Sequence, residues 1–402
     1  MGLRLGFHYH MLAARRETGQ VVVSSYIGVF IDSIAAECEH LILFFHSAPS
    51  HGKGTERVQT LNYTLTQPNI TWVDIGAHSS TLRRTFHPGP YTAHLTAWRE
   101  KLDALLIRGP SPLLPAMAAA AGDLPVVLLM VGDYLAEARA AGFSLAPRKL
   151  LQRAWVESYQ VRQARTIRRH MTVVNSRQLY HDFERIAPKI HETRTTTLTM
   201  DDGYEREDTC AAPPYRVLYT GRITASKGIA DLLDAVLMLR AAGIDLVLDL
   251  VGWPEDESFL PALAQTAAER GEAAALVYHG LKKVGAELFA YYKQADLYVI
   301  ASRSSFEGFP RTVWEAMAHS LPVAATPVGS IPMYLQDGET VILFTPNDPA
   351  ALAAALKRLI DDSGLRRRLI ANGRAVVKEN TLENRARELV GCIQEWVTTH
   401  GR

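Results

Sequence analysis

Two carboxylates and two cations stand in this chain at spacings where they could bind a polar ligand. Glu307 and Glu315 lie eight positions apart among apolar residues. Arg222 and Lys227 lie five positions apart. On one continuous helix the carboxylates would be separated by about 12 Å of axial rise, with faces offset by roughly 80°. They therefore cannot act as a close acid–base pair, and each is either a solvated surface charge or an acceptor of hydrogen bonds from a polar group.

A proline between the two carboxylates divides them between a loop and a helix. Pro310 lacks an N–H and suits a first helical turn, so we expect a helix to begin at Phe309 or Pro310. Glu307 then lies in the preceding loop beside Gly308, where a ligand can approach the backbone. The free N–H groups at this helix start would form an anion site. Glu315 lies further along the same helix.

The two cations follow the end of a predicted strand. That strand ends at Thr220 and Gly221, and Arg222 comes next. Lys227 then precedes Gly228 at the start of an amphipathic helical pattern. An Arg and a Lys at a strand end, flanked by glycines, could bind phosphate oxygens, because Arg offers a fork of donors and Lys a mobile charge. The alternative is a pair of ordinary surface cations.

Short apolar runs alternate with amphipathic stretches along the whole chain, which is typical of βαβ units and a mostly parallel sheet. Several runs are apolar at every position, as expected for strands covered on both faces. The predicted strands are residues 3–9, 40–47, 70–76, 103–109, 125–133, 170–176, 215–222, 245–252, 275–280, 295–302, 321–329 and 340–346. The pattern predicts an α/β fold with two doubly wound, Rossmann-like domains that face each other across a cleft, with ligands beyond the carboxyl ends of the strands.

The length of 402 residues favours two domains over one. A polar stretch with Gly203, Pro213 and Pro214 and no periodicity marks the boundary. We therefore predict an N-terminal domain over 1–203, a linker over 204–214 and a C-terminal domain over 215–385. A final helix over 386–402 could pack back towards the N-terminal domain.

Composition excludes several classes of function. The net charge of +1 gives no argument for a nucleic-acid partner. Three cysteines without CxxC spacing indicate reduced thiols and neither a zinc ribbon nor a disulfide framework. We find no signal-peptide pattern and no run of about 18 apolar residues, so the cytoplasm is expected. The basic stretch Arg148 to Arg169 could contact the inner face of a membrane; the alternative is a solvated helix face.

Several segments of the second half resemble one known family. They are residues 219–236, 250–256, 277–280, 295–344 and 347–362, which agree with it in order and spacing. They resemble the nucleotide-binding domain of retaining glycosyltransferases of family four, the glycosyl transferases group 1, which have the GT-B fold. The family's central element of two glutamates with seven residues between them is matched by Glu307 and Glu315. The resemblance covers about residues 215 to 375.

The resemblance implies a site for a nucleotide diphosphate sugar. Arg222 and Lys227, beside Gly221, are similar to the pair that holds the donor diphosphate and stabilises the leaving nucleotide. Glu315 is similar to the glutamate that binds the ribose hydroxyls. Glu307 is similar to the one that meets the hydroxyls of the donor sugar.

Two further segments complete the implied donor site. The segment of Gly308, Phe309 and Pro310 would offer backbone N–H groups to sugar and phosphate. The loop at His279 and Gly280 resembles the place where the base is recognised. The chain has no Asp-x-Asp, and cations fixed at the phosphate can replace a metal. We therefore predict a metal-independent enzyme of the EC 2.4 class with no cofactor besides the co-substrate.

The first half matches the family less well. Gly19 and Gln20 stand where the family's glycine-bearing loop often has two glycines. Many members carry a His after the strand that covers 125–131 here, near the donor sugar. This chain has Gly132 and Asp133 at that place.

Three explanations for the missing His stay open. Asp133 takes over part of its role, or His10 or Arg108 does, or the donor phosphate itself deprotonates the acceptor. Arg108 and Ser111 follow a predicted strand and are placed for contacts with the acceptor.

The leading function is transfer of a sugar from a nucleotide sugar to a hydroxyl acceptor in glycan, polysaccharide or glycoconjugate biosynthesis. UDP is preferred over GDP as the carrier, and a lipid-linked acceptor is one option. The alternatives are a hydrolysing nucleotide-sugar 2-epimerase, which shares the two-domain architecture, and a nucleotide-sugar-binding protein without catalysis.

Overall fold

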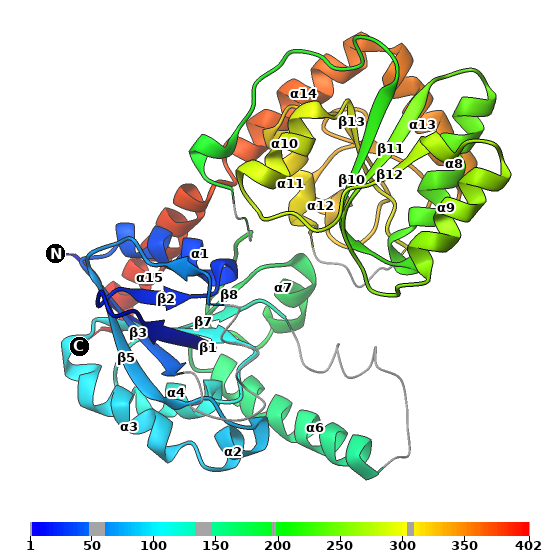
Figure 1. Ribbon diagram of the computed structural model, residues 1–402. Coiled ribbons are helices and arrows are strands. Elements are labelled where there is room, and N and C mark those ends of the chain that lie inside the picture. Colours follow the sequence, from blue (N-terminus) through cyan, green and yellow to red (C-terminus); the bar gives the residue numbers. More distant parts are fainter. Residues whose placement is uncertain are drawn as a thin grey trace. The chain divides into compact units, whose positions relative to one another are not determined.

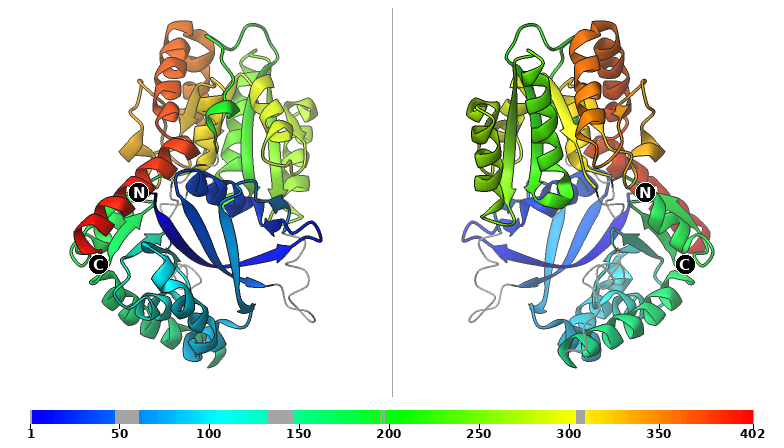
Figure 2. Two further views of the ribbon diagram at one scale, coloured as in Figure 1. Left: turned by 90° about the vertical axis from the view of Figure 1, so that its left-hand side faces the viewer. Right: turned by 90° about the vertical axis from the view of Figure 1, so that its right-hand side faces the viewer.

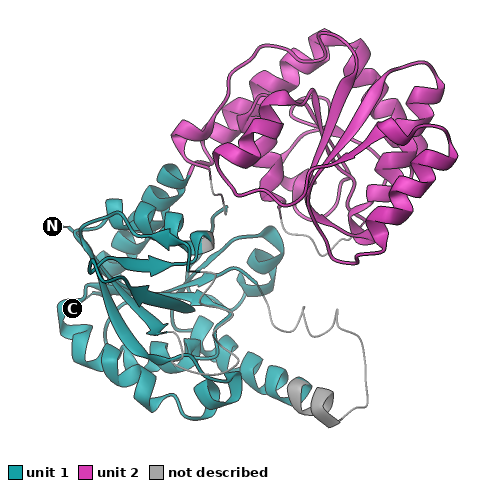
Figure 3. Ribbon diagram, viewed as in Figure 1, with its two compact units in different colours: residues 1–195, 382–402 teal, residues 196–381 magenta. Residues whose placement is uncertain are grey.

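The computed structural model describes residues 2–47, 61–132, 147–194, 196, 198–303 and 309–401. The chain divides into two compact units (Figure 1), coloured separately in Figure 3. Unit 1 comprises residues 1–195 with 382–402, and unit 2 comprises residues 196–381. Each unit is built on one sheet, as the alternation of apolar and amphipathic runs predicts.

The sheet of unit 1 is parallel at its centre. The parallel strands follow the order β5-β3-β1-β6-β7-β8-β9, and β2 and β4 add an antiparallel extension at the end of β1. The bounds are β1 Arg4–Arg15, β2 Val21–Val23, β3 His40–Ser47, β4 Tyr63–Thr64, β5 Ile70–Ala77, β6 Ala104–Gly109, β7 Val126–Met130, β8 Met171–Val174 and β9 Ile190–Glu192.

Two separate apolar clusters cover the two faces of this sheet. Phe45 belongs to one cluster and its neighbour Phe44 to the other, because successive side chains of a strand point to opposite faces. Figure 2 shows helices on both faces. Their bounds are α1 Ser25–Ala36, α2 Thr81–Phe86, α3 Gly89–Trp98, α4 Leu114–Ala120, α6 Pro147–Ile167, α7 Arg177–Phe183 and α15 Leu382–His400, with a 3-10 turn η2 at Arg99–Lys101.

Unit 2 has a wholly parallel sheet in the order β12-β11-β10-β13-β14-β15. Its strands are β10 Tyr215–Ile223, β11 Leu246–Pro254, β12 Leu276–Tyr278, β13 Leu297–Ile300, β14 Val323–Ala325 and β15 Ile342–Leu343. Its helices are α8 Ile229–Ala241, α9 Phe259–Glu269, α10 Ala286–Gln294, α11 Arg311–Ala318, α12 Ile331–Tyr334, α13 Pro349–Asp361 and α14 Ser363–Lys378, with 3-10 turns η3 Met200–Asp202, η4 Ala225–Lys227 and η5 Ala273–Ala275.

The polar segment 204–214, taken as a linker from its sequence, groups with unit 2. Arg206 donates to two main-chain carbonyls of α10, each at 3.1 Å. Asp208 accepts hydrogen bonds from both Nε and Nη2 of Arg366, at 2.6 and 3.0 Å. These charge-assisted contacts hold a segment that lacks apolar periodicity against the domain that follows it.

The last helix groups with the first unit. α15 contributes Leu389, Ile393 and Trp396 to the same buried cluster as Phe7. Its polar side adds ion pairs within unit 1, such as Lys189 with Glu395 at 3.0 Å. The chain therefore completes the core of unit 1 only after the whole of unit 2.

The first strand is longer than its apolar run. The prediction covers residues 3–9, whereas β1 continues to Arg15, because Leu12 and Ala13 are buried and pair with the end of β3. Across the described part of the chain, no helix combines the length and apolar character that crossing a bilayer would require.

Candidate donor site in unit 2

The strand order of unit 2 reverses between β10 and β13, since β11 pairs on one side of β10 and β13 on the other. In open α/β sheets, ligands bind beyond the carboxyl ends of the strands at such a switch point. Arg222 is the second-to-last residue of strand β10, and Lys227 is the last residue of the short turn η4 that follows. The fold thus brings the predicted phosphate-binding cations to the place where a ligand is expected.

The loops after β10 and β13 are locked together. Gly228 has φ +67°, and a Cβ at this position would lie 2.0 Å from the carbonyl oxygen of Ala301. The N–H of Arg303 donates to the carbonyl of Ser226 at 2.9 Å. The guanidinium of Arg303 also donates to both oxygens of Asp231 at 2.9 and 2.5 Å. This packing fixes the backbone on either side of Lys227.

Arg222 extends from a strand end that is tightly joined to β11. Its Nη1 lies 3.3 Å from Glu255 Oε1, and both side chains are about half exposed, so this pair holds the guanidinium weakly. Tyr219 donates to the Arg222 carbonyl at 2.7 Å. Gly221 has φ +138°, and a Cβ on Gly252 would lie 1.8 Å from the Gly221 carbonyl oxygen. The backbone is thus fixed while the cation stays accessible.

His279 follows β12 and is held by a buried carboxylate. Its Nε2–H donates to Asp249 Oδ1 at 2.7 Å, and Arg216 Nη2 donates to the same oxygen at 2.6 Å. Asp249 is 2% exposed. Gly280 has φ +75°, and its carbonyl accepts from the Gly252 N–H at 3.0 Å. The orientation of the His279 ring is therefore set from within the sheet.

Glu315 is 5% exposed and accepts a hydrogen bond from the Tyr292 hydroxyl at 2.8 Å. The Tyr292 oxygen also lies 2.6 Å from Thr220 Oγ1, which lies 3.1 Å from the Tyr298 hydroxyl. Burial, followed by the Glu315 charge, raises the pKa of Tyr292 well above its usual value, so this hydroxyl keeps its proton and donates. The surface-charge alternative is wrong for Glu315.

The helix that carries Glu315 begins next to Pro310. α11 starts at Arg311, and Pro310 is its N-cap residue, one position from the predicted start. The Phe309 ring stacks on Trp314 with centroids 3.9 Å apart. Two other predicted donor residues, Glu307 and Gly308, lie outside the described residues.

The candidate residues of unit 1 have structural partners. Ser111 is fully buried; its carbonyl accepts from the Tyr159 hydroxyl at 2.8 Å, and its N–H donates back to it at 3.3 Å. The Arg108 guanidinium is 4% exposed and lies over the Tyr9 ring at 4.8 Å. Gly19 has φ +85° in the turn between β1 and β2.

His10 and Asp133 are the two remaining predictions for unit 1. His10 lies within β1, where burial, followed by the Arg84 charge, lowers its pKa to about 3. It is therefore neutral at physiological pH. Asp133 lies outside the described residues. Within the described ranges, no cluster of three His, Cys, Asp or Glu side chains has a geometry that could hold a metal ion.

Sequence reasoning missed three supporting residues. Asp249 could have been found from the sequence, because a carboxylate inside an apolar strand needs a hydrogen-bonding partner. Tyr292 and Arg303 could not have been found in this way, because their partners, Glu315 and Asp231, are distant in the sequence.

Residues 205–376 match the family described as Glycosyl transferases group 1. This range covers nearly all of unit 2 and contains Arg222, Lys227, His279 and Glu315 at the sites described above. The second unit belongs to the glycosyl transferases group 1 family. The predicted family resemblance is thereby confirmed. The candidate residues of unit 1 lie outside the matched range.

The curated relatives of this glycosyltransferase unit match over part of their length. The D-inositol 3-phosphate glycosyltransferase of Corynebacterium glutamicum is 32% identical over 155 residues, 38% of this chain and 37% of that protein. The glycogen synthase of Mycobacterium tuberculosis is 29% identical over 153 residues, 37% of this chain and 34% of that protein. The chain thus aligns with little more than a third of the length of these relatives.

Solved structures match this chain over both units. A protein named HepE from Anabaena, solved in complex with UDP, has a TM-score of 0.69 at 15% identity over 98% of this chain and 100% of that chain. A glycosyltransferase from Rickettsia africae has a TM-score of 0.68 at 16% identity over 99% of both chains. At these low sequence identities the similarity shows the fold alone. It confirms the predicted GT-B fold class.

Proposed function

We propose that this protein is a retaining glycosyltransferase that transfers a sugar from a nucleotide diphosphate sugar, preferably a UDP-sugar, to a hydroxyl acceptor. The observation that carries the proposal is the convergence of Arg222 and Lys227 at the switch point of a sheet that belongs to the group 1 family. One of the relatives named above is a glycosyltransferase by name, which supports the same reaction class here.

Arg222 and Lys227 would stabilise the leaving diphosphate. Glycosyl transfer develops positive charge at the anomeric carbon and negative charge on the departing phosphates, so cations fixed beforehand at the phosphates favour the transition state. The locked backbone around Lys227 reduces the reorganisation that this requires. The proposal includes no metal requirement, because these cations supply the charge that a metal would.

Glu315 would accept hydrogen bonds from the ribose hydroxyls. The loop at His279 and Gly280 would contact the base, and its hydrogen bonds to Asp249 and Gly252 support a fixed shape for that contact. In this proposal the backbone around Phe309 and Pro310 meets the phosphates and sugar.

Two roles rest on the family resemblance alone. Glu307, beside Gly308, would bind the hydroxyls of the donor sugar. Asp133 would take over part of the role of the His that many members carry.

The preference for UDP is supported by the complexes of a structural neighbour. HepE from Anabaena has been solved with UDP, with UDP and glucose, and with UDP-glucose. That protein covers nearly the whole of this chain. We therefore propose a donor whose nucleotide is UDP in preference to GDP.

For the location we propose the cytoplasm, with a solvated outer face on α6. Trp155 donates to Thr85 Oγ1 at 3.1 Å and stacks on the buried Tyr159 ring. The aromatic side chains of the Arg148 to Arg169 stretch are thereby directed into unit 1, which supports the solvated alternative over membrane contact. Sedimentation with anionic liposomes tests this, and saturable binding would overturn it.

The donor site is tested by calorimetric titration with UDP, followed by incubation with UDP-glucose, UDP-N-acetylglucosamine and GDP-mannose. We expect UDP to bind and one nucleotide sugar to be slowly hydrolysed or transferred. Arg222→Ala/Lys227→Ala should weaken UDP binding by about 100-fold, since two charge-assisted contacts are lost. An epimerised sugar product, or binding without turnover, would identify one of the two alternative functions.

A matched control uses cations elsewhere on unit 2. Arg270→Ala/Lys357→Ala removes two exposed side chains that pair with Asp234 and Asp361 on helix surfaces. This variant should keep wild-type UDP affinity. Equal UDP affinity in both double variants would overturn the assigned role of Arg222 and Lys227.

A further inference from the structure

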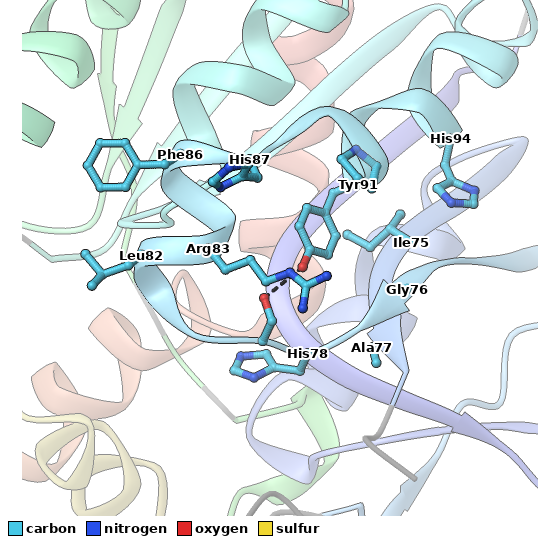
Figure 4. Close-up of a pocket in the computed structure, with 12 residues that line it drawn as sticks. Ile75, Gly76, Ala77, His78, Leu82, Arg83, Phe86, His87, Tyr91 and His94 are labelled. Atoms are coloured by element: carbon cyan, nitrogen blue, oxygen red, sulfur yellow. Dashed lines mark hydrogen bonds between the residues drawn. The ribbon is translucent and has the colours of Figure 1, made fainter. Parts of the chain in front are cut away.

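Unit 1 contains a pocket of about 860 Å³. It lies at the carboxyl end of β5, between that strand end and helices α2 and α3 (Figure 4). Carboxyl ends of parallel strands are where doubly wound sheets bind ligands. All of its lining residues belong to one stretch of unit 1, residues 75–94.

The lining is rich in donors of hydrogen bonds to anions. His78, His87, His94 and Arg83 line it, and none of its twelve lining residues is an Asp or Glu. Imidazole and guanidinium groups donate N–H to phosphate and carboxylate oxygens, and arginine does so through two parallel bonds. This composition favours an anionic group over a cationic one.

A buried imidazole lies directly behind the lining. The His46 ring is fully buried, with its centroid 5.3 Å from those of His78 and Tyr91. Its Nδ1–H donates to the Gly76 carbonyl at 3.0 Å, and its buried Nε2 has no hydrogen-bond partner among the described residues. A buried nitrogen without a partner costs free energy.

Two charges lie close to His46: the exposed carboxylate of Asp74, which accepts from the Gly76 N–H at 2.8 Å, and the buried guanidinium of Arg84. Arg84 is 4% exposed on α2. Burial, and to a smaller extent the Arg84 charge, lower the pKa of His46 to about 4, so that its Nε2 is an acceptor at neutral pH. The charge of Arg84 is the less screened of the two because it is buried, and a buried positive charge attracts an anion.

The rim of the pocket adds apolar surface. Leu82 and Phe86 are 57% and 61% exposed, and they project from consecutive turns of α2. Adjacent exposed apolar side chains that rim a pocket offer an apolar surface to a ligand. A ligand with an apolar or ring-shaped part beside its anionic group would cover them.

We propose that this pocket binds the glycosyl acceptor, a hydroxyl-bearing molecule whose phosphate or other anionic group contacts Arg83 and the pocket histidines. The proposal rests on the transferase function proposed above and names the chemical class of its second substrate. The anionic group belongs either to a soluble sugar phosphate or to a phosphorylated lipid, which share the chemistry that the pocket recognises.

The test is calorimetric titration with phenyl phosphate, which joins an anionic group to an apolar ring. It is done in the Arg222→Ala/Lys227→Ala background, so that phosphate binding at the donor site does not contribute. We expect saturable binding that weakens about tenfold in Arg83→Ala/His87→Ala. Both side chains are exposed, so this change threatens the fold little.

The matched control replaces an exposed Arg and an exposed His outside the pocket. Arg185→Ala/His181→Ala should keep the affinity for phenyl phosphate within about twofold, as for most surface changes. Uncharged phenol should bind at least about tenfold more weakly. Equal affinity in the pocket and control variants, or no saturable binding of phenyl phosphate, would overturn the proposal.

Two further probes distinguish the sources of the anion. Tighter binding of glucose 6-phosphate than of geranyl phosphate supports a soluble acceptor, and the reverse order supports a lipid-linked one. UDP titration of Arg83→Ala/His87→Ala in the otherwise wild-type chain separates the two proposals. If this variant binds UDP as the wild type does, failure of the pocket proposal does not affect the donor-site proposal. If the wild-type protein does not bind UDP, the donor-site proposal is wrong, whatever phenyl phosphate shows for the pocket.

Discussion

Tyr292 and Glu315 form a buried hydrogen bond in which the tyrosine hydroxyl donates to Oε2 at 2.8 Å. The two residues come from different helices, α10 and α11, and both are almost fully buried. A carboxylate removed from water requires such a donor. The bond therefore fixes one oxygen of the side chain to which we assign the ribose hydroxyls, and Tyr292 acts as a positioning residue.

Replacing Tyr292 by Phe should reduce UDP affinity about fivefold to tenfold, because one donor to a buried carboxylate is lost. Calorimetry measures this. Turnover at saturating donor should change less than affinity, which a purely structural defect would not produce. Tyr215→Phe, at the start of β10, is the matched control. Unchanged UDP affinity in Tyr292→Phe would contradict the positioning role.

Replacing Asp249 by Asn should disturb the loop that we assign to the base. The buried amide keeps the shape but removes the charge shared by His279 and Arg216, at a cost of about 1–3 kcal/mol in stability. We expect the ratio of UDP to GDP affinity to move towards unity. Competition between the two nucleotides measures it. Asp245→Asn, an exposed partner of Arg240, should leave the ratio unchanged.

Two glycines test the locked loop after β10. Gly228 and Gly243 both have positive φ, but a Cβ on Gly228 would meet the Ala301 carbonyl, whereas a Cβ on Gly243 meets nothing within 4 Å. Gly243→Ala should cost about 1 kcal/mol from backbone conformation alone. Gly228→Ala should cost at least about 2 kcal/mol more. Urea unfolding measures both, and equal costs would contradict the close approach.

The buried histidines of unit 1 should make the protein sensitive to acid. Burial lowers the pKa of His8 to about 3 and that of His46 to about 4. Unfolded histidines bind protons below about pH 6.5, so between that pH and the lower folded pKa the unfolded state binds more protons. The contribution of these neutral histidines to the free energy of unfolding is therefore fully present above about pH 6.5. It is lost as the pH falls from there towards the folded pKa values.

A variant of His46 tests this assignment. The charges that act on His46 are Arg84 and Asp74, and neither is altered in His46→Asn. In the variant, the slope of the free energy of unfolding against pH should be smaller by about 1.4 kcal/mol per pH unit, which corresponds to one proton. Urea midpoints at pH 7, 6 and 5 measure the slope. The exposed His181→Asn should keep the wild-type slope, and an equal slope in His46→Asn would contradict the assignment.

The last helix should matter for the first unit only. Trp396 is 6% exposed within the core of unit 1, so Trp396→Ala should destabilise that unit by about 3–5 kcal/mol. Hydrogen exchange measured by peptides should rise in β1 and β3 and stay unchanged in β10 and β11. Val397→Ala, at a half-buried position, is the milder control. Equal loss of protection in unit 2 would contradict the division into units.

Much of the fold is readable from local pattern. The strand at 40–47 coincides with β3, and the strand at 215–222 differs from β10 by one residue. Fully apolar runs between amphipathic helices have few other structures available to them. The predicted strand at 3–9 is shorter than β1, because the second half of β1 is stabilised by pairing with β2 and β3 and not by its own apolar pattern.

The sequence by itself determined the residue types and order of the donor site, since Arg222, Lys227 and Glu315 each stand near a strand end or helix start that local signals define. Only the tertiary structure decided their surroundings. The contacts of Tyr292, Asp249 and Arg303 with the site join segments far apart in the chain. Burial and hydrogen bonding across such distances follow from how the sheet is assembled, which no local pattern specifies.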